Sequence, residues 1–249
     1  MNQFQGTFKR FETKFLINEE QYRLLMESMK GSLNIDEYGV TSICSIYFDT
    51  PDYRLIRNSL EKPVYKEKLR LRSYGTPAEG DKVFVELKKK YQGIVYKRRE
   101  RMELSEAEHY LYDYRPAKKK TQITREIDWF LRFYDNLVPS MYVSYSRIAM
   151  LGDKCPGLRI TFDKNILWRK EELYLECGSF GKPLLEDGQR LMEIKVPEAM
   201  PIWLVRHLDE LEIYPVSFSK YGNAYLQSQL QKEEKTRPDQ MIKGEMRYA

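Results

Sequence analysis

The sequence predicts an α+β fold in which an antiparallel sheet has one charged face and one apolar face covered by helices. Three strand-like stretches each carry a Glu-x-Lys pair beside apolar residues: Glu12/Lys14, Glu86/Lys88 and Glu193/Lys195. Residues two apart in a strand point to the same face, so each pair sets an acid beside an amine. Amphipathic helical stretches between the strands can cover the apolar side.

The composition is that of a folded, strongly charged protein. The chain has 249 residues, of which 32% are charged and 13% are aromatic, a combination that argues against disorder. We expect a single domain over residues 1–233 and a polar, flexible tail at 234–249. No signal-peptide pattern and no run of about 18 apolar residues occurs, so a cytoplasmic protein is expected.

The first part of the chain alternates strands and helices. Residues 8–17 alternate charged and apolar side chains, as in a strand. Asn18 and Gln21 form a predicted capping box, which opens a helix to about residue 29. Residues 43–49 are the second strand. Pro51 then suits the first position of a short helix that ends near residue 60.

Three consecutive strands follow as an antiparallel meander. They cover residues 65–74, 82–90 and 94–104. Glycine-containing turns at 75–80 and 91–93 join them. Because the connections are short, neighbours in the chain are expected to be neighbours in the sheet.

The second half resumes the alternation. Ser105 and Glu108 resemble a capping box, and apolar spacing over 127–134 marks another helix. The later strands are expected at 141–149, 158–163 and 190–197. The last two helices are expected at 202–211 and 220–233.

The basic residues follow the strand period, and they share faces in two sets: Lys66, Lys68, Arg70 and Arg72; and Lys97, Arg99 and Arg101. An open sheet with one solvated face explains this pattern, and so does a barrel closed around a polar interior. The supply of helices for the apolar face favours the barrel. An interior with so many cations needs a polyanion, because like charges repel strongly in a confined site. Phosphate chains fit, since arginine presents a planar fork to phosphate oxygens.

Eight segments occur in an order known from one protein family: Arg10-Phe11-Glu12-x-Lys14-Phe15, Ile46-Tyr47-Phe48-Asp49-Thr50, Leu69-Arg70-Leu71-Arg72-x-Tyr74-Gly75, Val85-Glu86-Leu87-Lys88, Tyr145-x-Arg147, Arg159-x-x-x-Asp163, Glu193-Ile194-Lys195 and Ser219-Lys220-Tyr221. In these segments the chain resembles a VTC-type domain, the polyphosphate polymerase branch of the triphosphate tunnel metalloenzymes (the CYTH-like superfamily). The resemblance runs from Arg10 to about Tyr225.

The resemblance implies an antiparallel eight-stranded β-barrel, the triphosphate tunnel, with flanking helices. Such a tunnel would bind ATP and inorganic polyphosphate with Mn²⁺ or Mg²⁺ and transfer the γ-phosphate of ATP to a growing chain. The implied catalytic residues are Lys14, Arg70, Arg72, Lys88 and Arg147. The implied substrate-binding residues are Lys97, Arg159, Ser219 and Lys220. The implied metal ligands are Glu193 and, less strongly, Glu12 and Glu86.

One departure from the wider superfamily separates the alternatives. Tunnel hydrolases and cyclases usually begin with Glu-x-Glu-x-Lys, whereas Arg10 stands at the first Glu position here. This favours the polymerase branch over a metal-dependent triphosphate hydrolase. A non-catalytic sensor of polyphosphate or nucleotides is the other alternative, and the glutamates of the predicted interior argue against it. Known eukaryotic members carry membrane helices, so any membrane association of this chain is expected to need a separate membrane-protein partner.

Other features have ordinary explanations. His109 and His207 lie in predicted helices and are expected at the surface or partly buried. No His/Cys cluster has the spacing of a zinc site. The basic runs at 97–99 and 118–120 are compatible with nucleic acid. The second is better explained as a solvated loop or a docking patch for a chain product, and no nucleic-acid partner is expected.

Overall fold

A computed structural model describes residues 11–92, 94–152 and 155–236 of the chain. The strands are β1 (Phe11–Ile17), β2 (Leu33–Asp49), β3 (Tyr65–Tyr74), β4 (Lys82–Tyr91), β5 (Ile94–Glu103), β6 (Val138–Gly152), β7 (Arg159–Arg169), β8 (Lys182–Pro183) and β9 (Arg190–Val196). The helices are α1 (Glu19–Ser28), α2 (Arg54–Leu60), α3 (Leu104–Leu111), α4 (Gln122–Tyr134), α5 (Ile202–Glu210) and α6 (Lys220–Thr236).

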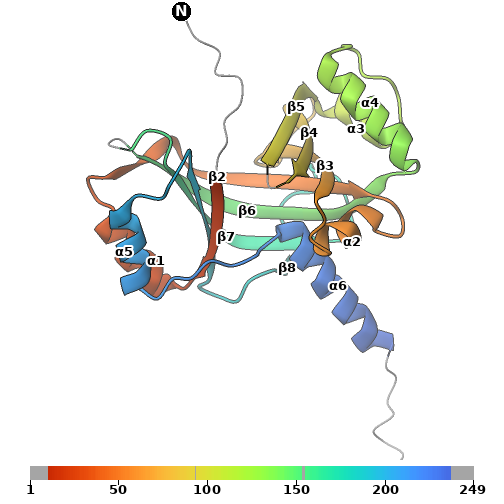
Figure 1. Ribbon diagram of the computed structural model, residues 1–249. Coiled ribbons are helices and arrows are strands. Elements are labelled where there is room, and N and C mark those ends of the chain that lie inside the picture. Colours follow the sequence, from red (N-terminus) through yellow and green to blue (C-terminus); the bar gives the residue numbers. More distant parts are fainter. Residues whose placement is uncertain (1–10, 93, 153–154, 237–249) are drawn as a thin grey trace, which may run out of the picture.

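Eight strands form one antiparallel sheet in the order β1-β9-β7-β6-β2-β3-β4-β5, and the short β8 pairs with β7. The long strands β2, β6 and β7 run through the middle of the molecule (Figure 1). Within the described residues, no strand pairing joins the two ends of this order, β1 and β5. The charges of Glu12 and Lys14 of β1 nonetheless act on the pKa of Lys88 of β4. The sheet therefore curves enough to bring β1 and β4 near each other. The predicted α+β fold with an eight-stranded antiparallel sheet is confirmed.

Helices cover the apolar face of the sheet at two places. One core cluster joins Leu71 of β3 and Val85 of β4 to Ala107 of α3 and Phe130 of α4. A second joins β1, β7 and β9 to α1 and α5 around residues such as Phe162. Figure 1 shows α3 with α4 and α1 with α5 at opposite ends of the long strands. This arrangement matches the predicted role of the amphipathic helices, because burying their apolar stripes stabilises both layers.

The opposite face of the sheet carries Arg70, Glu86, Arg147 and Asp163, and we call it the inner face. It is not charged throughout. Tyr47, Met141 and Trp168 form a third apolar cluster there, which includes residues of α2 and α6. The prediction that helices cover the apolar face was therefore incomplete, because α2 and α6 pack on the inner face.

Helix α1 begins as predicted. The Asn18 carboxamide oxygen accepts the Gln21 amide at 2.8 Å, and the Gln21 side chain accepts the Asn18 amide at 3.0 Å. The capping box predicted at Ser105 is wrong. Helix α3 starts at Leu104, and Glu103 before it makes no side-chain cap. Leu104 is buried in the core, and its packing makes the helix start one residue before Ser105.

The start of α2 also differs from the prediction at Pro51. The helix begins at Arg54, after Tyr53 with a φ of 61°. Its first turn is capped by Asp49 at the end of β2, whose carboxylate accepts the backbone N–H groups of Leu55 and Ile56 at 2.8 and 3.0 Å. A carboxylate from the preceding strand thus replaces a local cap, satisfying two amides that the helix itself leaves unpaired.

Several elements are longer than predicted. Strand β2 starts at Leu33 rather than residue 43, and β7 continues to Arg169. Residues 34–42 are mostly exposed, so no apolar alternation marks them in the sequence. Helix α6 runs to Thr236, into the predicted tail. None of the described helices is long and apolar enough to cross a membrane.

Candidate functional site

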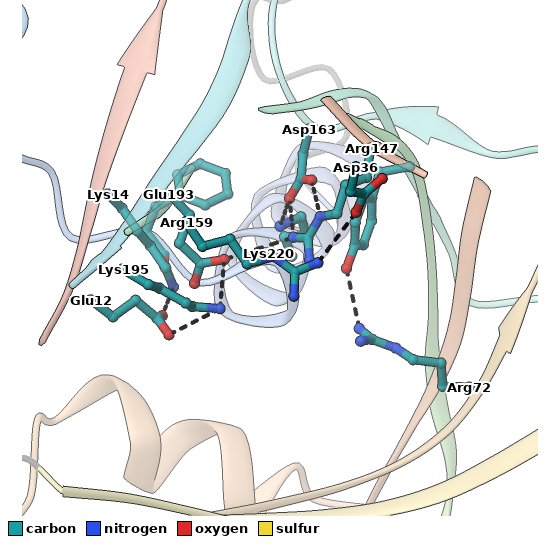
Figure 2. Close-up of polar contacts among 12 residues, drawn as sticks. Glu12, Lys14, Asp36, Arg72, Arg147, Arg159, Asp163, Glu193, Lys195 and Lys220 are labelled. Atoms are coloured by element: carbon teal, nitrogen blue, oxygen red, sulfur yellow. Dashed lines mark hydrogen bonds and ion pairs between the residues drawn. The ribbon is translucent and has the colours of Figure 1, made fainter. Parts of the chain in front are cut away.

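Charged side chains from distant parts of the chain converge on the inner face. In Figure 2, Glu12, Lys14, Glu193 and Lys195 lie beside Arg147, Asp163 and Lys220, and Arg72 points toward this group from the other side. The register of β1 and β9 explains part of the group, because it sets Lys14 opposite Glu193. Cross-strand neighbours of opposite charge stabilise this pairing.

Glu86 is the centre of one ion-pair cluster. Its side chain is 1% exposed, and its Oε2 accepts hydrogen bonds from Nε and Nη2 of Arg70 at 2.8 and 2.6 Å. Its Oε1 accepts Nζ of Lys97 at 2.8 Å and Nε of Arg99 at 2.6 Å. Nη1 of Arg72 lies 3.9 Å from Oε2 of Glu86. Burial would raise the pKa of Glu86, but these positive charges hold it well below its usual value.

Asp163 is the centre of a second cluster. It is fully buried, and its carboxylate accepts hydrogen bonds from Nε and Nη2 of Arg147 at 2.6 and 2.8 Å, which makes a bidentate pair. Lys220, the first residue of α6, donates to Oδ2 of Asp163 at 2.5 Å. Burial would raise the pKa of Asp163, but Lys220 and Arg147 lower it. This carboxylate therefore fixes both cations and holds the start of α6 against β7.

Two further carboxylates lie side by side at β1 and β9. Nζ of Lys195 is 3.6 Å from Oε2 of Glu12 and 3.4 Å from Oε2 of Glu193. Nζ of Lys14 is 3.4 Å from the other oxygen of Glu12. Burial would raise the pKa of Glu193, but its contact with Glu12 and the charges of Lys195 and Lys14 lower it. Glu193 is consequently ionised at neutral pH.

Tyrosines hold the two arginines of β3. Nη1 of Arg70 donates to the Tyr47 hydroxyl at 3.2 Å, and Nη2 of Arg72 donates to the Tyr145 hydroxyl at 3.1 Å. Burial would raise the pKa of Tyr47, but the charges of Arg70, Arg72 and Lys68 lower it to about 7. A phenol with this pKa changes charge in the physiological range.

Two lysines offer donors to an anion. Nζ of Lys68 donates to the Ser219 hydroxyl at 2.9 Å, and burial lowers its pKa to about 8. Burial also lowers the pKa of Lys88. Lys88 has no hydrogen-bond or ion-pair partner in the part of the chain that the structure describes. Its ammonium group is poorly compensated unless an anion joins it.

The structure brings most of the predicted site residues together. Those on the inner face or at its edge against α6 are Glu12, Lys14, Arg70, Arg72, Glu86, Lys88, Lys97, Arg147, Glu193, Ser219 and Lys220. Arg159 lies opposite Lys195 on the same face, but its side chain is half-exposed and lies 3.8 Å from Asp36. Arg10, which separates the polymerase branch from the hydrolases in sequence, lies outside the described residues.

Other residues of the site had no assigned role in the sequence prediction. Lys68 and Arg99 belong to the same charged faces as Arg70 and Lys97, so the strand period was a sufficient signal for them. Asp163 and Tyr47 lie in the matched segments, but their partners come from other strands and from α6. No local pattern could have identified those partners.

Glu12 and Glu193 fit a divalent cation. Thr161, the cross-strand neighbour of Glu193, is buried and its hydroxyl has no hydrogen-bond partner. Mg²⁺ typically takes one or two carboxylates and completes its shell with phosphates and water. In the described residues no three His, Cys, Asp or Glu form a metal-binding group, so phosphate oxygens would have to complete this one. Glu86 does not fit, because both of its oxygens accept hydrogen bonds from Arg70, Lys97 and Arg99 at 2.6–2.8 Å. The lysines beside Glu12 and Glu193 are farther away, at 3.4–3.6 Å.

The histidines and cysteines take no part in this site. Each histidine contacts a carboxylate close to it in the chain: His109 contacts Asp113, and His207 contacts Glu210. A recess of about 1050 Å³ between α1 and the start of β2 is also separate from the site. It is lined by residues such as Tyr22 and Met26, and no set of cations converges there.

Comparison with solved structures finds one that supports the fold. A candidate adenylate cyclase from Bacillus halodurans is 15% identical, with 84% of this chain and 92% of that chain covered and a TM-score of 0.51. One from Vibrio parahaemolyticus is 12% identical, with 89% and 99% covered and a TM-score of 0.43. The Mimivirus capping enzyme triphosphatase is 12% identical, with 81% and 88% covered. Its TM-score is 0.35, and neither this structure nor the one from Vibrio parahaemolyticus is similar enough to carry an argument.

Sequence comparison identifies the family. No curated protein matches the chain. The model of the VTC domain matches residues 9–229, which includes every strand that the structure describes and the helices from α1 into α6. The match covers the inner-face residues described above. The chain therefore belongs to the VTC domain family.

Proposed function

We propose that the inner face binds the triphosphate of ATP and that the protein is a metal-dependent polyphosphate polymerase. It would transfer the γ-phosphate of ATP to the end of a growing polyphosphate chain. One observation carries this proposal: cations from β3, β4, β6 and α6 converge on the same space as the ionised carboxylate of Glu193. That combination suits a phosphate chain together with a divalent cation.

The arginines are held in place before any ligand binds. Glu86 accepts two N–H groups of Arg70, and Tyr145 and Ser45 accept N–H groups of Arg72. Preorganised donors need no reorganisation when charge develops on the transferred phosphoryl group. The buried carboxylate of Glu86 therefore acts as a positioning residue for Arg70 and its neighbours.

Glu12 and Glu193 would hold Mg²⁺ or Mn²⁺, which when bound neutralises charge on the phosphates. The residues of the chain do the remaining work. Phosphoryl transfer depends mainly on alignment and electrostatic stabilisation, so it requires no covalent nucleophile from the protein. Lys88 and Lys68 would screen the repulsion between donor and acceptor phosphates, since both are half-buried ammonium groups that lie opposite each other on the inner face.

The test is incubation of the purified protein with ATP and Mn²⁺ or Mg²⁺, scored for both long-chain polyphosphate and free phosphate. Polyphosphate supports the proposal. Free phosphate alone would replace it with a triphosphate hydrolase, and tight binding without product would replace it with a sensor. Arg72→Ala should abolish nucleotide binding. Arg98→Ala is a matched control, because Arg98 contacts Glu126 of α4 on the other face of the sheet.

A further inference from the structure

An aromatic platform stands at one end of the inner face. Tyr74, the last residue of β3, packs edge to face with Phe84 of β4, with ring centroids 5.7 Å apart and planes at 84°. The guanidinium of Arg99 lies 4.3 Å from the Phe84 ring and 5.9 Å from the Tyr74 ring. Tyr74 is 51% exposed, so much of its side chain is open to a ligand.

Arg99 ties this platform to the charged site. Its Nη2 donates to the Tyr74 hydroxyl at 3.2 Å, and its Nε donates to Glu86 at 2.6 Å. An exposed tyrosine normally samples several rotamers, but these contacts restrain Tyr74. A ligand that stacks on a restrained ring loses less side-chain entropy on binding.

The spacing places the platform beside the proposed triphosphate site. The register sets Phe84 opposite Arg72 and Glu86 opposite Arg70. Same-face neighbours in a strand are about 6.5 to 7 Å apart, so Tyr74 lies one such step beyond Arg72. The sugar of a nucleotide separates its base from the α-phosphate by a step of similar length. A nucleoside triphosphate with its phosphates at Arg70 and Arg72 would bring its base to Tyr74.

The other end of the same strands has a different character. Lys66 and Lys90 lie directly opposite each other in β3 and β4. Burial lowers the pKa of Lys66, and the charges of Lys90, Lys14 and Lys62 lower it further. Like charges directly opposite each other destabilise a sheet, so an anion bound here would relieve that cost.

We infer that Tyr74, supported by Phe84 and Arg99, stacks on the base of the donor nucleotide, and that the polyphosphate chain extends past Lys66 and Lys90. The inference rests on the proposed function and adds a direction to it. The nucleoside lies at the Tyr74 end, and the polyanion lies toward the lysine end. Because stacking is tolerant of base identity, the platform distinguishes a nucleoside triphosphate from inorganic triphosphate rather than one base from another.

The first test measures binding of ATP and of inorganic tripolyphosphate by titration calorimetry. Tyr74→Ala should weaken ATP binding about 5- to 150-fold, the range found for removing one stacked base contact, and leave tripolyphosphate binding unchanged. Tyr74→Trp should retain ATP binding, since tryptophan also stacks. The control is Tyr96→Ala, which removes an exposed tyrosine of β5 that is not on the inner face.

A second test concerns the direction of the chain. Lys90→Ala should weaken the binding of long-chain polyphosphate several-fold and leave ATP binding unchanged. The control is Lys89→Ala, which removes one positive charge from the other face of β4. Equal loss of ATP and tripolyphosphate in Tyr74→Ala would overturn the stacking role and leave the proposed function intact. Weaker binding of ATP but not of polyphosphate in Lys90→Ala would overturn the proposed direction of the chain. A wild-type protein that binds no triphosphate at all would refute the proposed function itself.

Discussion

Tyr221 of α6 donates its hydroxyl to Oδ2 of Asp49 at the end of β2, with 2.8 Å between the two oxygens. The same carboxylate caps the first turn of α2. The Tyr221 ring also stacks on Tyr47, with centroids 4.6 Å apart, and the Tyr47 hydroxyl accepts a hydrogen bond from Arg70. One buried unit therefore connects two helices to the predicted phosphate site.

Removal of the Tyr221 hydroxyl should destabilise the fold. Tyr221→Phe leaves a buried carboxylate of Asp49 without one of its donors, which costs about 1–3 kcal/mol. Urea unfolding measures the difference from wild type. Tyr96→Phe, at an exposed position, should stay within about 0.5 kcal/mol. An unchanged stability in Tyr221→Phe would show that Asp49 does not depend on this bond.

Neutralising Glu86 should be more costly. Glu86→Gln removes a buried negative charge that pairs with the largely buried Arg70, and breaking a buried pair costs about 3–5 kcal/mol. Glu103→Gln, in an exposed pair with Lys82, should cost less than about 1 kcal/mol. Polyphosphate should stabilise Glu86→Gln more than wild type, because it replaces the lost counter-charge. Equal stabilisation of the two proteins would contradict this account.

The contribution of Glu86 should depend on pH. Its folded-state pKa lies below its unfolded value of about 4.3. The stability it contributes is therefore complete above that unfolded value, and it is lost as pH falls toward the lower folded pKa. Denaturation curves of wild type and Glu86→Gln should converge as the solution is acidified below about pH 4. A constant difference down to acid pH would mean that another group is responsible.

Glu193→Gln should separate binding from turnover. ATP should still bind, because the arginines and lysines are unchanged. Turnover should fall by about 100- to 1,000-fold, the usual effect of removing one charge-stabilising group. Binding by calorimetry and product formation are measured on the same preparation, with the exposed Glu198→Gln as control. Wild-type turnover in Glu193→Gln would exclude this residue from the metal site.

Affinity for ATP should decrease as pH rises from 7 to 9. Burial lowers the pKa of Lys68 and of Lys97 to about 8, so both lose positive charge above that pH. Tyr47, with a pKa of about 7, gains negative charge over the lower part of this interval. All three changes weaken an anion site. Tyr47→Phe should remove the loss near pH 7 and keep the loss near pH 8, and a flat binding profile would reject the assignment.

Local sequence signals succeeded where a structure depends on neighbours in the chain. The capping box of Asn18 and Gln21 is present, and the boundaries of β3 are those predicted. Predictions from Pro51 and Ser105 were wrong because a distant carboxylate caps α2 and core packing sets the start of α3. The exposed part of β2 escaped prediction because pairing with β6, rather than apolar alternation, orders it.

The sequence by itself determined which side chains share a face of each strand, because side-chain direction in a strand has a period of two. It therefore placed Arg70 with Arg72, and Glu86 with Lys88, on the charged faces of their own strands. Only the tertiary structure decided which of these charges meet. Glu86 pairs with cations of two flanking strands, and Asp163 pairs with Lys220 at the start of α6, 57 residues away in the chain. Those partners depend on sheet register, curvature and helix docking, which arise from packing over the whole domain.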